Sequence, residues 1–204
     1  MSKSQVIHIH GGNPFDSREQ YYAYLQKEEF NPYEVKKRWS QWIAQELSDV
    51  AEVFLPSMPA KQDADYLAWK IWFEKLFPYL GNEKIILTGK SLGTIFLIKY
   101  LSENTFPKPI HTIHLVALVF DGEGIEDEGT ANFILDPEKL QNVLQQVGKI
   151  HLWHSVDDPV CPWHHVEKYQ QYFPDAILHQ FEDRGHFGQS EFPELLVEIQ
   201  KEIS

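Results

Sequence analysis

The chain has 204 residues, of which 43% are hydrophobic, and this is enough to build one domain with a sizeable core. Its 30 acidic and 18 basic side chains give a formal charge of −12, which repels phosphate backbones and argues against nucleic acid as a partner. No apolar run approaches the roughly eighteen residues of a membrane-spanning helix, so we expect no membrane span. A strand pattern begins almost at once and leaves no room for a signal peptide, and the single cysteine, Cys161, excludes an internal disulfide. Both features predict a cytoplasmic protein.

Residues 5–10 alternate in polarity and predict a first strand that ends in a Gly-Gly-Asn-Pro turn. No G-x-G-x-x-G motif follows this strand, so a dinucleotide-binding fold lacks its expected phosphate loop. Residues 14–30 are an insert rich in aromatic side chains. We interpret this insert in two ways, either as a pocket wall or small lid above the carboxyl edge of the sheet, or as a short packed helix.

The rest of the chain alternates between helical and strand patterns. Asn31 and Pro32 predict the start of the first crossover helix, Asp63 the cap of the next, and Gly148 the end of a later one. Strands separated by helices predict a single α/β domain with a parallel sheet of about six strands and helices on both faces. The ligand crevice should then lie at the carboxyl ends of the strands. The other predicted strands are residues 50–55, 85–88, 110–120, 149–154 and 176–181, and the other predicted helices are residues 64–77, 92–102, 163–173 and a closing helix from 192.

The rest of the chain is arranged around residues 84–101, which read KIILTGKSLGTIFLIKYL. A β-branched apolar run stops at Gly89, and apolar residues resume at helical spacing after Gly93, so the pattern predicts strand, tight turn and helix. The turn carries G-x-S-x-G, which in this setting predicts a nucleophile elbow with Ser91 on a strained bend. We expect that Gly89 and Gly93 must be glycine, because a Cβ atom at either position would clash where the strand and the helix pass closely. The alternative interpretation is an ordinary Gly/Ser turn.

Two further strand ends carry the residues that acyl transfer by a serine needs. Asp157 and Asp158 follow the fifth strand and His186 follows the sixth, and the chain order Ser, Asp, His is that of the α/β-hydrolases. We predict that His186 is the general base for Ser91. Asp158 is predicted to orient that base, because the proline turn directly after it would fix its loop. Each residue taken alone would also suit an ordinary loop, and the combination favours catalysis.

Backbone amides are the predicted donors to the oxyanion. The first is the amide of Leu92, which follows the nucleophile, and the second is that of Gly12 or Asn13 in the turn after the first strand. The candidates for the substrate pocket are Phe15, Tyr22 and Lys90.

Other polar clusters favour ordinary roles over metal or cofactor chemistry. The acidic loop of residues 121–129 resembles a calcium loop only superficially, because its sixth position is Glu126 instead of glycine. Cys161 has no elbow of its own and is interpreted as a packed thiol. The run of residues 36–38 is interpreted as a solvated helix face. Histidine pairs that lack the full complement of a metal motif are His8 with His10, His111 with His114, and His164 with His165. We predict no metal and no other cofactor.

The run HSVDDPVCPW, followed by FEDRGHFGQSEFPEL, resembles the small serine hydrolases typified by retinoblastoma-binding protein nine, a compact branch of the α/β-hydrolase superfamily. The resemblance covers nearly the whole chain and is tightest from Ile150 onward. It implies the compact α/β-hydrolase fold, and it implies that Ser91 is the nucleophile, Asp158 the acid and His186 the base. The chain departs from the family in its first turn, HGGNPF, and in Lys90, where a histidine is more usual.

These features together predict a serine hydrolase with esterase-like activity, which cleaves a small carboxylic ester or related acyl compound through an acyl-enzyme. One alternative is a hydrolase-fold binding module, a pseudoenzyme that acts through protein or ligand interaction. Another is a flavodoxin-like binding domain, which has the same alternation of strands and helices. The family's eukaryotic namesake is associated with partner-protein binding, but no feature of the sequence indicates a particular protein partner.

Overall fold

The computed structural model describes residues 3–15, 17–33, 36–125 and 129–204. Within these ranges the strands form one six-stranded sheet in the order β2-β1-β3-β4-β5-β6, and every neighbouring pair is parallel. The predicted α/β class and parallel sheet are therefore confirmed. The strands are β1 Ser4–Ile9, β2 Ala51–Phe54, β3 Ile85–Lys90, β4 Ile110–Val116, β5 Val147–Ser155 and β6 Ile177–Phe181.

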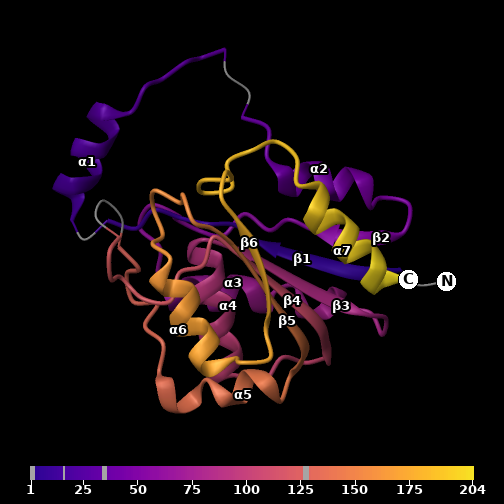
Figure 1. Cartoon of the computed structure of the whole chain (residues 1–204). Coiled ribbons are helices and arrows are strands. Elements are labelled where there is room, and N and C mark those ends of the chain that lie inside the picture. Colours follow the sequence, from indigo (N-terminus) through magenta and orange to yellow (C-terminus); the bar gives the residue numbers. More distant parts are fainter. Residues whose placement is uncertain (1–2, 16, 34–35, 126–128) are drawn as a thin grey trace.

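Helices cover both faces of this sheet, as expected for central strands that are apolar along their whole length. Helices α2 and α7 lie on one face, and α3, α4, α5 and α6 lie on the other (Figure 1). Each face has its own hydrophobic core, one built around Trp39 and Phe192 and the other around Trp69 and Phe96. The helices are α1 Arg18–Lys27, α2 Trp39–Glu46, α3 Tyr66–Glu74, α4 Leu92–Glu103, α5 Gln141–Leu144, α6 His164–Tyr172 and α7 Pro193–Ile203, with short 3-10 turns at Phe77–Tyr79 and Pro137–Lys139.

The prediction for the first crossover helix was wrong at its start. Asn31 Oδ1 accepts a hydrogen bond from the backbone N–H of Tyr33 at 3.0 Å, so Asn31 and Pro32 begin a turn, and α2 starts only at Trp39. The next cap is also displaced by two residues. Asp65, and not Asp63, accepts a bond from the N–H of Ala68 at 2.8 Å.

Two further predicted boundaries differ from the structure. β4 ends at Val116, not at residue 120, because Ala117 adopts φ +52° and turns the chain out of the sheet. Gly148 does not end a helix but lies within β5, where a Cβ atom would come 2.7 Å from the carbonyl oxygen of His111. The short helix α5 ends at Leu144, before the strand begins.

The strand order places the ligand crevice between β1 and β3. The chain steps from β1 to β2 in one direction and continues from β3 to β6 in the other, so the carboxyl ends of β1 and β3 flank the topological switch point. The turn after Ile9 therefore faces the residue that follows Lys90. Among the described residues, no helix combines the length and the apolar character that crossing a bilayer requires.

Candidate active site

Ser91 stands between β3 and α4 in a conformation that L-residues rarely adopt. Its φ is +52° and its ψ −123°, as expected for a serine on a strained elbow. Hydrogen bonds on both sides hold this backbone. The N–H of Ser91 donates to the carbonyl of Val116 at 2.9 Å, and the carbonyl of Ser91 accepts from the N–H of Thr94 at 2.8 Å and from its hydroxyl at 2.7 Å.

The two glycines of the motif are required by close backbone approaches. A Cβ atom at Gly89 would lie 2.7 Å from the carbonyl oxygen of Gly93, where strand and helix pass each other as predicted. A Cβ atom at Gly93 would lie 2.3 Å from the carbonyl oxygen of Ile9 in the neighbouring strand β1. The second glycine therefore lets α4 pack against β1, a contact that the local sequence pattern did not indicate.

His186 and Asp158 are paired. The His186 Nδ1 atom lies 2.9 Å from Asp158 Oδ2 and 3.0 Å from Asp158 Oδ1. Asp158 Oδ1 also accepts hydrogen bonds from the N–H groups of Val160 at 2.9 Å and Cys161 at 3.0 Å. Burial opposes the charge on this carboxyl, but the pairing with His186 and the two amides outweigh it and lower the pKa of Asp158 below its usual value of 3.8.

The neighbouring Asp157 has different partners. Its Oδ1 accepts from the hydroxyl of Ser155 at 2.5 Å and from the N–H of Gly185 at 2.9 Å. The hydroxyl of Ser155 in turn accepts from the N–H of Arg184 at 3.1 Å. Asp157 therefore ties the loop of β5 to the loop that carries His186, while Asp158 faces the imidazole itself.

Ser91 and His186 line the same hollow of about 730 Å³ at the carboxyl ends of β1 and β3. Ser91 is only 6% exposed, and it borders this hollow. Within the described part of the chain, no hydrogen bond joins the Ser91 hydroxyl to the His186 ring. Such bonds are often long in ligand-free enzymes and tighten when substrate is present.

The two predicted positions for the second oxyanion donor differ in the structure. The N–H of Asn13 donates to the carbonyl of Lys61 at 3.0 Å, which turns it away from a ligand. No backbone hydrogen bond of the described residues uses the N–H of Gly12, and Gly12 lines the hollow beside Ser91. Leu92 is the first residue of α4, so its N–H has no partner within the helix.

The predicted pocket residues separate into two groups. Lys90 lines the hollow of Ser91 and His186, and its ammonium donates to the carbonyl of Phe187 at 2.9 Å, which anchors the loop of the histidine. Phe15 instead lines a second hollow of about 920 Å³. Tyr22 is 51% exposed and lines neither of these two hollows, so its role in a substrate pocket stays a prediction. Tyr24 packs on Phe15 with ring centroids 5.1 Å apart and contributes to the second hollow.

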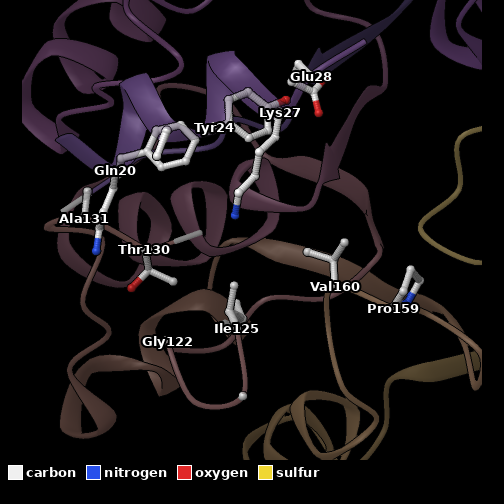
Figure 2. Close-up of a pocket in the computed structure, with 14 residues that line it drawn as sticks. Gln20, Tyr24, Lys27, Glu28, Gly122, Ile125, Thr130, Ala131, Pro159 and Val160 are labelled. Carbon is white, nitrogen blue, oxygen red and sulfur yellow. The ribbon is translucent and has the colours of Figure 1, made fainter. Parts of the chain in front are cut away.

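Figure 2 shows this second hollow, with Tyr24 and Lys27 of α1 on one side and Ile125 and Val160 on the other. A narrow gap of about 10 Å³ lies next to Ser91 and shares Ile125 and Val160 with the larger hollow. The helix α1 belongs to the predicted aromatic insert and has no buried residue. It therefore lines a cavity from outside the core instead of packing into it.

Several histidines that the sequence left unassigned are buried structural groups. His154 Nδ1 accepts from the N–H of Leu118 at 3.0 Å and its Nε2 faces the carbonyl of Cys161 at 2.9 Å, which supports the loop of Asp158 from below. The donors that could hold a cation in the described residues form three groups: Asp121, His164 and His165; Asp158, Cys161 and His186; and His151, Glu198 and Glu202. Lys168 already pairs with Asp121 at 2.6 Å in the first group. The predicted acidic loop residues Glu126 to Glu128 lie outside the described residues.

Comparison with known proteins relates this chain to hydrolases. No family model matches the chain. Serine hydrolase RBBP9 from Rattus norvegicus is 26% identical over 160 residues, which are 78% of this chain and 82% of that protein. The solved structure of the ydeN gene product from B. subtilis has a TM-score of 0.75 and 18% identity over 98% of both chains. A methylesterase, MES16 from Arabidopsis, has a TM-score of 0.56 and 13% identity over 97% of both.

The sheet order and these likenesses show that the chain has the fold of the α/β-hydrolases. It resembles the small serine hydrolases of the RBBP9 type, as its sequence predicted. Its relatives include serine hydrolases and esterases, and they support a hydrolase function for this chain.

Proposed function

We propose that this protein is a cytoplasmic serine hydrolase that cleaves small carboxylic esters or related acyl compounds through an acyl-enzyme. The observation that carries the proposal is the convergence of a strained Ser91 and a His186 paired with Asp158 at one hollow. Three strand ends supply these residues, and an ordinary turn would require neither the positive φ nor the histidine–aspartate pair.

In the proposed reaction, Ser91 Oγ attacks the acyl carbonyl carbon while its proton passes to Nε2 of His186. Asp158 stabilises the imidazolium through Nδ1. The N–H groups of Leu92 and Gly12 donate to the oxyanion of the tetrahedral intermediate. Collapse of that intermediate breaks the bond to the leaving group, which takes the proton from His186. A water molecule then hydrolyses the acyl-enzyme by the same steps in reverse.

The second hollow is proposed to receive the acyl group. The gap beside Ser91 opens toward Ile125 and Val160, and the wall beyond it is formed by Phe15 and Tyr24 of the insert at residues 14–30. These apolar and aromatic side chains suit a short hydrocarbon acyl chain, although Gln20, Lys27 and Glu28 give the same hollow polar groups as well.

A fluorophosphonate probe tests the nucleophile directly. We expect one adduct by intact mass on the folded protein and none on Ser91→Ala, with hydrolysis of 4-nitrophenyl acetate reduced about a thousandfold or more in that variant. Ser190→Ala is the matched control, since Ser190 lines the same hollow, and it should retain both labelling and hydrolysis. Absence of any adduct on the folded wild type would instead favour a binding module with this fold.

A further inference from the structure

The hollow of Ser91 and His186 has a lining whose charge is opposite to that of the molecule. The whole chain carries a formal charge of −12. No aspartate or glutamate is among the described residues that line this hollow. Five cationic side chains line it: Lys36, Lys37, Arg38, Lys61 and Lys90. Positive groups gathered in one concave surface of an acidic protein raise the local concentration of anionic ligands.

The cations are brought there by three separate parts of the chain. Residues 36–38 were interpreted as one solvated face of a helix, but they lie before α2 and outside any helix, and Arg38 has an extended backbone with φ −121° and ψ 137°. Trp39 follows them and is buried between His8 and Phe192, with ring centroids 4.9 Å and 5.7 Å away. This packing holds the basic segment beside the loop that carries His186.

The remaining cations come from the other rim of the hollow. Lys61 lies in the loop between β2 and α3, and its carbonyl holds the amide of Asn13 at 3.0 Å. Lys90 is the last residue of β3, and its ammonium donates a hydrogen bond to the carbonyl of Phe187 in the loop that carries His186. In the described part of the structure, no ion pair engages Lys36, Lys37, Arg38 or Lys61. These four side chains are therefore available to an anion.

The charges reach the interior of the hollow. The pKa of His8 is lowered from 6.5 to about 3, chiefly by burial, with smaller contributions from the charges of His10, Lys90 and Arg38. Burial likewise lowers the pKa of His10, with a contribution from the charges of Lys61 and Arg38. The side chains of different segments thus act on the same space.

Geometry indicates which part of the substrate meets these cations. His186 returns its proton to the leaving group, so the leaving group must lie on the histidine side of Ser91. That side is the cationic hollow, which the loop from His186 to Ser190 also lines. The oxyanion donor Leu92 instead lines the narrow gap toward Ile125, on the acyl side. We infer that the natural substrate is an acyl compound whose leaving group carries an anionic group, a carboxylate or a phosphate. This inference rests on the proposed function.

The test compares three acetate esters that differ in the charge of the leaving group: 4-acetoxybenzoate, its neutral methyl ester, and 4-acetoxyphenyl phosphate. For each, kcat and KM are measured for the wild type and for Arg38→Gln, Lys61→Gln and Lys37→Gln. For each protein, kcat/KM for an anionic ester is divided by kcat/KM for the neutral ester. Comparing this ratio between the wild type and each variant removes the difference in intrinsic reactivity of the esters. Lys149→Gln is the control, because Lys149 lies near the amino end of β5, whereas the hollow lies at the carboxyl ends of the strands.

We expect each variant of the hollow to lower the ratio about three- to tenfold for at least one anionic ester, through KM and not kcat. Raised salt should lower the wild-type ratio as well, because Lys36, Lys37 and Arg38 are exposed and their charges are screened. The ester whose ratio falls more identifies carboxylate or phosphate as the preferred group. Ratios that are equal in all variants and at all salt concentrations would overturn the inference while leaving the proposed function intact. Loss of hydrolysis of all three esters together with loss of the Ser91 adduct would overturn the proposed function itself.

Discussion

Asp157 and Asp158 are neighbours in the chain, yet their carboxylates face different partners. Asp158 is buried against the His186 ring and receives two backbone N–H groups, whereas Asp157 is bonded to Ser155 and Gly185 in the loop. If Asp158 orients the imidazole, its charge is needed for the imidazolium that forms during the reaction. Substituting each of the two neighbouring aspartates in turn therefore compares a carboxylate that faces His186 with one that does not.

Asp158→Asn is expected to lower kcat by about a thousandfold or more, because an amide can stabilise the wrong tautomer of His186 and cannot stabilise the imidazolium. Asp157→Asn removes a charge of the same sign one residue away, and we expect a loss of about tenfold or less. The measurement is the rate of ester hydrolysis, with circular dichroism to show that both variants fold. A larger loss for Asp157→Asn than for Asp158→Asn would contradict the assignment.

The sequence favoured Asp158 over Asp157, but it left the second oxyanion donor open between Gly12 and Asn13. The proline after Asp158 marks a fixed turn, and a local pattern can show such a turn. We propose Gly12 over Asn13 because the N–H of Asn13 donates to the carbonyl of Lys61, which lies in a distant loop. The cationic hollow escaped prediction for the same reason, because its members come from separate parts of the chain and only the fold brings them together.

The strand–turn–helix unit of β3 and α4 packs through close backbone contacts, at Gly89 with Gly93 and at Gly93 with Ile9 of β1. Gly93→Ala would place a Cβ atom 2.3 Å from the carbonyl of Ile9. Neither backbone can move without separating α4 from the sheet, so we expect a loss of roughly 3 kcal/mol or more in the free energy of unfolding. Gly188→Ala is the control, since a Cβ atom there meets nothing within 4 Å. Urea unfolding of both variants measures the difference, and a Gly93→Ala protein as stable as wild type would refute this account.

Elements with strong periodicity were predicted well, and elements defined by tertiary contact were not. The apolar run of β3 and the helical spacing of α4 are local signals, and both appear where expected. The pattern after Pro32 also looked helical, but residues 36–38 lie outside any helix and α2 starts only at Trp39, whose ring is buried against Phe192. A cap residue such as Asn31 serves a turn as readily as a helix, so the sequence alone could not distinguish them.

At the scale of the whole molecule, acid should destabilise the fold, because several ionisable groups are buried in the protonation state they hold near neutral pH. Burial lowers the pKa of His8 to about 3 and that of His179 to about 4. In the core beneath α7, His114 Nε2 lies 3.1 Å from Glu202 Oε2, and His151 Nε2 lies 3.4 Å from Glu202 Oε1. Burial alone would raise the pKa of Glu202, but these ring contacts outweigh it and lower the pKa below its ordinary value of 4.5.

The unfolded chain binds protons at its histidines near pH 6.5, whereas the folded chain binds them at His8 and His179 only near pH 3 to 4. By linkage, the free energy of unfolding should fall as the pH decreases from about 6.5, by up to about 1.4 kcal/mol per pH unit for each such group.

The lowered pKa of Glu202 adds stability above pH 4.5 that is lost on further acidification. Glu202→Gln should therefore be less stable than wild type at pH 7 by about 1 to 3 kcal/mol, with a gap that narrows below pH 4.5. Urea unfolding at a series of pH values measures both effects, with the exposed Glu46→Gln as control. A wild-type stability that stays level from pH 7 to 4 would contradict this account, because it would show that His8 and His179 take up protons as readily in the fold as in the unfolded chain.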